Sequence, residues 1–346
     1  MLARVPEQNK RPGVSYAVTD DGIELPVIDL THASFAHDPS PEELAQLSAS
    51  SVRSLRRSMN TPPFVLRLLS RHSIIMRGTL EASGAFLTGM ATYVQNLGPE
   101  NLGKGYSGPM DRRLAATIGP TSTRMRLKVV AELTAEGLAP ILEARRDGPL
   151  HLLNVGGGAA ADSTNALILI RRERPDLLKG RRICVHVLDV DGAAPRFGAR
   201  ALAALLSQGA PLHGLGATLD HIHYDWADVG RLRELLERIA APDATIVGSS
   251  EGGLFEYGTD EEIVANLEVV RGATPDDSFM VGTTIRDDRS ADPCLRVMKE
   301  IGKMPRVRFL GLDELKPLAT RAGWVIDRAV EGNPFYHIFR LRKETS

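Results

Sequence analysis

Three glycines and an aspartate stand where they can hold a nucleoside. Gly156, Gly157 and Gly158 directly follow an apolar run and precede a stretch where a helix is expected to begin. Glycines at such a turn let the backbone approach a ligand and direct free N–H groups at it. A second apolar run ends in Asp189, and a carboxylate at that tip can accept two hydrogen bonds from the hydroxyls of a ribose. We therefore predict that the glycine turn and Asp189 bind one nucleoside between them.

The residues that follow the second and third apolar runs extend this predicted nucleoside site. Val190 comes directly after the ribose acid, and Asp191 is a second, less favoured carboxylate at the same tip. The third run closes with HIHYDWAD, in which Asp225 can accept a hydrogen bond from an adenine amino group while Trp226 flanks the ring. The alternative for each acid is a solvated strand end or a helix cap.

A fourth apolar run carries candidate catalytic residues to the same edge of the predicted sheet. It ends in Ser249, Ser250 and Glu251. We predict that Glu251 is the principal catalytic residue, either as a general base toward an acceptor proton or as an anchor for a cationic group. The alternative is a cap of the following turn. Phe255 and Tyr257 come next, and aromatic faces there can hold a cation without supplying a competing nucleophile. Ordinary packing is the alternative, more so for Phe255.

Other polar residues indicate a ligand less directly. Tyr106 lies in a Gly- and Pro-rich stretch at 97–120, which is either a lid or a plain connector, and it is a further catalytic candidate. Arg286 is a candidate for binding a substrate carboxylate, against the alternative of a solvated, self-paired loop. His221 and His223 share one face of a strand, but a metal ion would need a third ligand that the spacing does not offer. No metal site is predicted, and His223 is kept as a substrate-binding candidate.

The composition excludes several classes of protein. Hydrophobic residues make up 43% and charged residues 25%, as in ordinary globular proteins. Lys and Arg number 42 against 43 acidic residues, so no basic field favours nucleic acid as a partner. Cys184, assigned to the core, and Cys294 show no metal or disulfide spacing. No apolar run approaches the ~20 residues of a membrane span, and the polar N-terminus does not resemble a signal peptide. We expect a cytoplasmic protein without a membrane partner.

Apolar periodicity divides the chain near residue 147. Residues 1–146 are interpreted as an N-terminal arm and a helical cap or lid region, which also offers a surface for a homodimer. Its helices are predicted at 41–58, 61–71, 73–96 and 121–146. The Asp-Gly-Pro at 147–149 marks the boundary, and residues 147–346 form the second predicted domain.

In 147–346, short apolar strands alternate with helices. Strands are predicted at 151–155, 183–188, 217–222, 245–248, 279–284, 324–329 and 336–341, with helices at 162–173, 194–207, 228–240, 259–271 and 311–322. Such alternation predicts a parallel sheet covered on both faces. Only a short EGNP turn separates the last two strands, which permits only an antiparallel hairpin. The predicted fold class is therefore α/β, with a seven-stranded Rossmann-like sheet of six parallel strands and one antiparallel strand.

Taken together, HLLNVGGGAAAD, HVLDVD, HYDWAD, IVGSSEGGLFEYG and the closing hairpin resemble the class I S-adenosylmethionine-dependent methyltransferase superfamily over residues 147–346. The resemblance implies S-adenosylmethionine as cofactor, held by the glycine turn, Asp189, Val190, Asp225 and Trp226, with Ser249 and Ser250 at its edge. There are two departures. Asn154 stands where the family usually has a carboxylate, so that a contact to the methionine amino group would come from an uncharged amide, and Ala160 replaces the last glycine of the turn.

The resemblance favours transfer of the methyl group to a small-molecule acceptor, and other functions are kept as alternatives. One is a different chemistry of the same cofactor, either aminocarboxypropyl transfer as in nicotianamine-type synthases or cyclisation to azetidine-2-carboxylate, which releases methylthioadenosine. A nicotinamide-dependent oxidoreductase is another, because the turn also fits G-x-G-x-x-A, although the terminal hairpin argues against it. The last is a cofactor-binding interaction protein without enzymatic activity.

Overall fold

The computed structural model describes residues 5–59, 73, 75, 88–102, 108–302, 304 and 306–344. The helices and strands in these residues are short 3-10 turns at Glu7–Asn9 and Pro175–Leu177, β1 (Tyr16–Val18), β2 (Glu24–Pro26), α1 (Pro41–Met59), α4 (Gly89–Leu97), α5 (Pro109–Ala115), α6 (Ile118–Ala144), β3 (Leu150–Val155), α7 (Ala161–Glu173), β4 (Arg182–Asp189), α8 (Ala193–Leu206), β5 (Gly216–His223), α9 (Gly230–Ile239), β6 (Thr245–Ser250), α10 (Leu254–Tyr257), α11 (Asp260–Ala273), β7 (Phe279–Ile285), α12 (Pro293–Glu300), α13 (Gly311–Arg321), β8 (Trp324–Val330) and β9 (Tyr336–Lys343).

Seven of these strands form one sheet in the order β5-β4-β3-β6-β7-β9-β8. The pairs β5-β4, β4-β3, β3-β6 and β6-β7 are parallel. Strand β9 runs antiparallel to both of its neighbours, β7 and β8. The prediction of six parallel strands with one antiparallel strand inserted is confirmed. The order reverses between β3 and β6, so the carboxyl ends of these two strands flank the crevice where open α/β sheets bind ligands.

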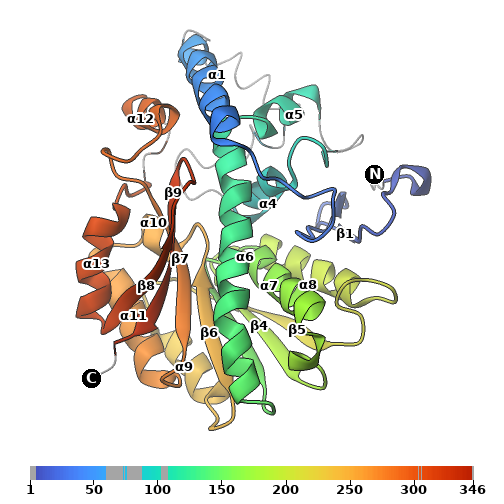
Figure 1. The fold of residues 1–346 in the computed structure, drawn as a ribbon, viewed down its shortest axis with the longest axis vertical. Coiled ribbons are helices and arrows are strands. Elements are labelled where there is room, and N and C mark those ends of the chain that lie inside the picture. The colour runs from blue at the N-terminus through green and yellow to red at the C-terminus, as the bar shows by residue number, and fades with distance from the viewer. Residues whose placement is uncertain are drawn as a thin grey trace.

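Helices cover both faces of the sheet (Figure 1). On one face α6, α7 and α8 bury apolar residues such as Leu127, Ile168 and Phe197 against alternate residues of the strands. On the other face α9, α11 and α13 do so with residues such as Leu235 and Leu267. Strands β3, β6 and β7 are buried along their whole length, as expected for a parallel sheet covered on both faces.

The N-terminal residues pack on this sheet-and-helix layer. The antiparallel hairpin β1-β2 contacts α8, and the backbone after it is held by Asn165 of α7, whose side chain bonds Leu30 N at 2.8 Å and Ile28 O at 3.1 Å. Helix α6 contacts α7, β6, β7 and β9 and crosses the front of the sheet in Figure 1. Helix α6 precedes residue 147 in the chain but packs on the sheet as α7 and α8 do. The division of the chain into two domains at residue 147 stays a prediction.

Some predicted elements in the N-terminal half cannot be compared with the structure, and others differ from it. The predicted helix 61–71 and most of 73–96 lie outside the described residues, and α4 represents only the end of the latter. The stretch 97–120, expected to be a loop, contains α5 and the start of α6. Among the described helices, none is both long enough and apolar enough to cross a membrane.

Candidate functional site

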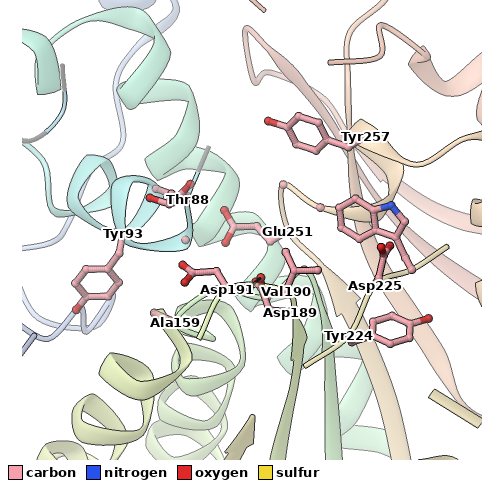
Figure 2. A pocket seen from close by; sticks show the side chains of 18 of the residues that line it. Thr88, Tyr93, Ala159, Asp189, Val190, Asp191, Tyr224, Asp225, Glu251 and Tyr257 are labelled. Carbon is pink, nitrogen blue, oxygen red and sulfur yellow. Dashed lines mark hydrogen bonds between the residues drawn. The ribbon is translucent and has the colours of Figure 1, made fainter. Parts of the chain in front are cut away.

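A pocket of about 640 Å³ opens at the carboxyl ends of the strands, between the glycine turn and α4. Figure 2 shows Asp189 and Val190 beneath Glu251, with Asp225 to one side and Thr88 on the other. The predicted site residues that line the pocket are Gly156, Gly157, Gly158, Asp189, Val190, Asp225, Trp226, Glu251 and Tyr257. Residues separated by about a hundred positions in the chain therefore meet in one cavity, as the strand order requires.

The glycine turn brings the backbone close to helix α4. Gly156 and Gly158 have φ values of +65° and +52°, a region that is open to glycine and costly for other residues. Ala160 adopts φ +53° at the start of α7, and no other non-glycine residue in the described part of the chain has a positive φ. Gly89, at the N-terminus of α4, is so near that a Cβ on it would lie 2.7 Å from Gly158 Cα. Helix α4 therefore forms the wall of the pocket opposite the strand ends.

Asp189 is tied to the glycine turn through its carboxylate. One oxygen accepts from Gly158 N at 3.0 Å and the other from Asp191 N at 2.9 Å. Burial raises the pKa of this carboxyl, although both backbone bonds oppose the shift. Each carboxylate oxygen keeps acceptor capacity beyond its one backbone bond, so Asp189 can also receive the hydroxyls of a sugar in the pocket.

The far side of the pocket has an apolar wall edged by a carboxylate. Val190 is 48% exposed and lines the pocket directly after the end of β4. The ring of Trp226 lies close to the turn, with its Cζ3 atom 3.2 Å from where a Cβ on Gly156 would be. Asn266 holds the Trp226 carbonyl at 2.8 Å. Asp225 accepts from Ala227 N at 3.0 Å through one carboxylate oxygen, Oδ1, and a flat ring with an amino edge would fit this arrangement.

The structure places Asn154 beneath the turn, where it does not line the pocket. Its Nδ2 donates to the Asp162 carboxylate at 2.8 and 3.0 Å and to Ser249 Oγ at 2.9 Å, and its Oδ1 accepts from Ser163 Oγ at 2.7 Å. Ser249 in turn donates to Asp162 at 2.6 Å. All four side chains are buried. Asn154 and Ser249, predicted to contact the cofactor, thus belong to a polar network that supports the turn from within, and neither lines the pocket.

Asp162 is the member of this network that sequence reasoning missed. Its carboxylate is 1% exposed, and burial raises its pKa despite the bonds from Ser249 and Asn154. It lies in the first turn of α7, where the helix dipole favours a negative charge. A carboxylate therefore does lie under the glycine turn, but it comes from the helix and not from the end of the strand.

Ser250 and Phe255 also have internal roles. Ser250 is fully buried, donates to Val155 O at 2.8 Å and accepts from Leu254 N at 2.9 Å, so it joins the end of β6 to β3 and α10. Phe255 is fully buried and packs edge-on against Phe339 with 5.2 Å between ring centres. The packing alternative for Phe255 applies, because neither residue lines the pocket.

Glu251 lines the pocket and is paired with a buried arginine that the sequence did not indicate. Arg126, on α6, donates from Nε to Glu251 Oε1 at 2.9 Å and from Nη1 to Glu256 Oε1 at 3.1 Å. Its guanidinium lies 4.3 Å from the ring centre of Tyr336, and Thr283 donates to Glu256 at 2.7 Å. Burial raises the pKa of Glu251 to about 7, against the opposing influence of Arg126. The Glu251 carboxyl therefore exchanges a proton near neutral pH while the arginine fixes its position.

Of the remaining candidates in the described part of the chain, Arg286 and His223 do not line the pocket and Tyr257 does. Arg286 is 8% exposed and is held by the terminal hairpin, where Nε donates to Asn333 O at 2.7 Å and Nη2 to Glu331 at 2.8 Å, so it differs from the solvated loop paired within itself that was the alternative. His223 is exposed at the end of β5 and does not line the pocket. Tyr257 does line it, whereas Tyr106 lies outside the described residues.

A smaller cavity of about 140 Å³ shares Asn96 of α4 with the main pocket. Arg124 lines it and is 6% exposed, with an ion pair to Glu100 at 3.6 Å. The Asn96 Oδ1 and His37 Nε2 atoms, buried in the same walls, have no hydrogen-bond partner within the described residues. Positive charge and unsatisfied polar atoms therefore lie at the end of α4 away from the glycine turn.

No protein-family model matches this sequence, and no curated protein matches it either. Solved structures do show similarity. A possible exported protein from Bordetella parapertussis superposes with a TM-score of 0.50 at 15% identity, over 90% of this chain and 98% of that one. A structure of LepI in complex with S-adenosylmethionine gives 0.37 at 13% identity, over 57% and 43%. The 1,6-didemethyltoxoflavin-N1-methyltransferase of Burkholderia thailandensis with bound S-adenosylhomocysteine gives 0.37 at 14%, over 62% and 79%.

At these identities the similarity is one of fold. The alignment spans less than half of the length of LepI, whereas it spans nearly the whole of the Bordetella protein and includes most of the N-terminal half of this chain. The sheet order with its antiparallel strand next to the edge differs from the six-stranded dinucleotide-binding order that a nicotinamide enzyme would need.

Proposed function

We propose that this chain, which has the fold of the class I S-adenosylmethionine-dependent methyltransferases, binds S-adenosylmethionine and transfers its methyl group to a small-molecule acceptor. One observation carries the proposal: the glycine turn, Asp189 and the wall of Val190 and Trp226 share a pocket with Glu251. A nucleoside recognition surface and a titratable carboxylate with a pKa near neutrality thus face the same space. Such a combination is typical of an active site.

The binding residues have distinct parts in this proposal. Asp189 accepts hydrogen bonds from the ribose hydroxyls, while Val190 and Trp226 flank the adenine and Asp225 accepts from its amino group. The glycine turn lets the backbone approach the rest of the cofactor. The sulfonium supplies an already activated methyl group when the cofactor is bound, so the protein has mainly to align an acceptor and exclude water.

Glu251 is the residue that we assign to the acceptor. Its buried carboxyl, with a pKa of about 7, can hold or accept a proton at neutral pH, which is the condition for an effective general base. The bond from Arg126 Nε uses one oxygen and leaves the other for the acceptor. Tyr257 lines the same pocket and offers an aromatic face beside a developing or fixed positive charge.

A second candidate keeps the cofactor and changes the bond that breaks. It is favoured by the Asn154 network, because the side chain at the position that usually contacts the methionine amino group is fully engaged with Asp162, Ser249 and Ser163. An amino group without that contact is available to attack Cγ of the same methionine moiety, which closes azetidine-2-carboxylate and releases methylthioadenosine. In aminocarboxypropyl transfer a nucleophile of the acceptor attacks that carbon instead, with the same leaving group. Both candidates predict the same nucleoside contacts and differ only in their products.

Product analysis separates the candidates. The purified protein is incubated with S-adenosylmethionine, alone and with pooled small metabolites, and the sulfur-containing products are identified by mass spectrometry. S-adenosylhomocysteine together with a methylated acceptor supports methyl transfer, and methylthioadenosine supports the second candidate. Tight binding of the cofactor with neither product would favour a non-enzymatic role and contradict both.

A further inference from the structure

Two histidines and a cysteine gather on one face of the sheet, apart from the pocket. His151 on β3 is in register with Cys184 on β4, and His186 follows two residues later on the same face. This is the face covered by α9 and α11, because Leu153 and Leu188, which continue the two rows, pack in that core. None of the three side chains lines the pocket.

The three side chains are close enough to share one ion. One potential ligand atom from each lies within 4.8 Å of the others. His151 Nδ1 and His186 Nε2 are 2.9 Å apart, and the rings are nearly parallel, with 21° between their planes. The histidines are 3% and 4% exposed.

Two polar side chains of the edge strand β5, Thr218 and Asp220, lie beside Cys184 and His186. His186 Nδ1 is buried without a hydrogen-bond partner among the described residues, and it faces Asp220 Oδ2 at 3.9 Å. Thr218 Oγ1 lies 3.7 Å from Cys184 Sγ. In metal sites a ligating histidine commonly gives its other ring N–H to a carboxylate, which orients the ring. Asp220 stands at that position for His186.

We propose that His151, Cys184 and His186 bind a single Zn²⁺ ion. Two imidazoles and a thiolate suit a borderline-soft divalent cation. With Zn–N near 2.0 Å and Zn–S near 2.3 Å, tetrahedral ligands stand roughly 3.3–3.6 Å apart. The two rings would separate by a few tenths of an ångström as the ion replaces their shared proton, and Sγ would move inward by about 1 Å.

The site is open from one side only. Thr218 and Asp220 on β5 are exposed, whereas Cys184 is half-buried behind them, so the ion enters over the edge strand and a water completes the coordination. The ion would join β3 to β4 three residues before Asp189, the residue that ends β4. Its function is therefore structural, and it does not depend on the activity proposed for the pocket.

Metal titration of the full-length, tag-free chain tests the proposal. Protein treated with a chelator and then desalted is titrated with Zn²⁺ in competition with a chromogenic chelator, and with Co²⁺ to record the thiolate-to-metal absorption. We expect one ion per chain and a thiolate–cobalt band. Cys184→Ser should abolish the band and weaken Zn²⁺ binding at least about 10-fold, whereas Cys294→Ser, which changes the other free cysteine, should leave both unchanged.

Asp220→Asn provides a second variant, at an exposed position where the substitution leaves the buried core unchanged. It should weaken Zn²⁺ binding about 10-fold or more, as loss of an orienting carboxylate does. Absence of stoichiometric Zn²⁺ uptake by the wild type would overturn the proposal. So would uptake that is unchanged in Cys184→Ser, because binding would then reside in exposed histidines such as His223.

Discussion

The guanidinium of Arg126 lies between two carboxylates and donates to Glu251 on the pocket side and to Glu256 on the buried side, at 2.9 and 3.1 Å. Glu251 lines the pocket and Glu256 does not. The two residues thus share a partner and a buried environment but differ in access to a ligand. Neutralising either carboxylate removes one ion-pair partner of the same arginine. A comparison of variants at the two positions therefore separates a chemical role of Glu251 from a structural one.

Glu251→Gln should lower turnover about 100-fold or more while cofactor affinity stays near that of the wild type, because the amide keeps the shape but loses basicity. Glu256→Gln is the matched control. It should reduce stability, as loss of one partner of a buried ion pair does, with a normal rate per bound cofactor. Steady-state kinetics and calorimetric cofactor titration give both quantities. Equal effects of the two variants on rate would make Glu251 a structural partner of Arg126.

The pH dependence of Glu251 should be visible in both rate and stability. Turnover should rise as pH increases through about 7, since the base form appears there. The folded pKa is raised from 4.5, so the folded state binds this proton more tightly than the unfolded chain. The contribution of Glu251 protonation to the free energy of unfolding is therefore fully present below about pH 4.5 and is lost as the pH rises through about 7. Denaturant titrations of wild type and Glu251→Gln across this range should show the variant gaining relative stability. A constant difference would contradict the raised pKa.

The contact between α4 and the glycine turn predicts a steric effect. A Cβ on Gly89 would lie 2.7 Å from both Gly158 Cα and Ala194 Cβ, so Gly89→Ala should push α4 away from the turn. We expect a loss of about 1–3 kcal/mol in unfolding free energy and weaker cofactor binding. Gly272→Ala is the control, because no atom lies within 4 Å of a Cβ there. Thermal unfolding and cofactor titration of both variants measure the effect, and unchanged cofactor affinity in Gly89→Ala would show that α4 does not help to form the site.

Asn154→Asp restores the residue type that the similar family usually carries, and in this chain it should be harmful. The new carboxylate would replace the Nδ2 donor that bonds Asp162 at 2.8 Å, placing two buried carboxylates in contact, which cannot both ionise at low cost. The folded-state pKa of the pair would rise, so the loss of stability should be larger at pH 8 than at pH 5. Denaturant unfolding at the two pH values measures this. A variant as stable as the wild type at both would show that Asp162 is not the charge under the turn.

Much of the sheet could be predicted from the sequence because its signals are local. The apolar runs mark each strand, the EGNP turn requires the hairpin between β8 and β9, and the glycines mark the first turn. The parts that were missed have no comparable pattern. Helices α5 and α12 are short, and the hairpin β1-β2 has strands of only three residues. Strands of this length are too short to show an apolar periodicity, and the hairpin is stabilised by packing on α8.

The gathering of the glycine turn, Asp189 and Asp225 in one cavity was also predictable, since these residues sit at strand ends, where topology brings them together. The residues that were missed act across long sequence distances. Arg126 reads as one more polar residue of a helix, and nothing in its neighbourhood indicates Glu251, 125 positions away. Asn154 matches a family position, but only the structure shows that Asp162 occupies its hydrogen bonds. The zinc site proposed above combines residues of two strands, with no ligand spacing along the chain.

Calorimetric titration of the chain with S-adenosylmethionine, S-adenosylhomocysteine and NAD, on the wild type and on Asp189→Asn, tests the central claim most directly. We predict binding of both adenosyl-sulfur ligands in the micromolar range and none of NAD. Asp189→Asn removes the carboxylate that we propose receives the ribose hydroxyls, which should weaken binding by about 1.5–3 kcal/mol. Asp191→Asn, also in the pocket, should change it less. Binding of NAD with no affinity for either adenosyl-sulfur ligand would contradict the account.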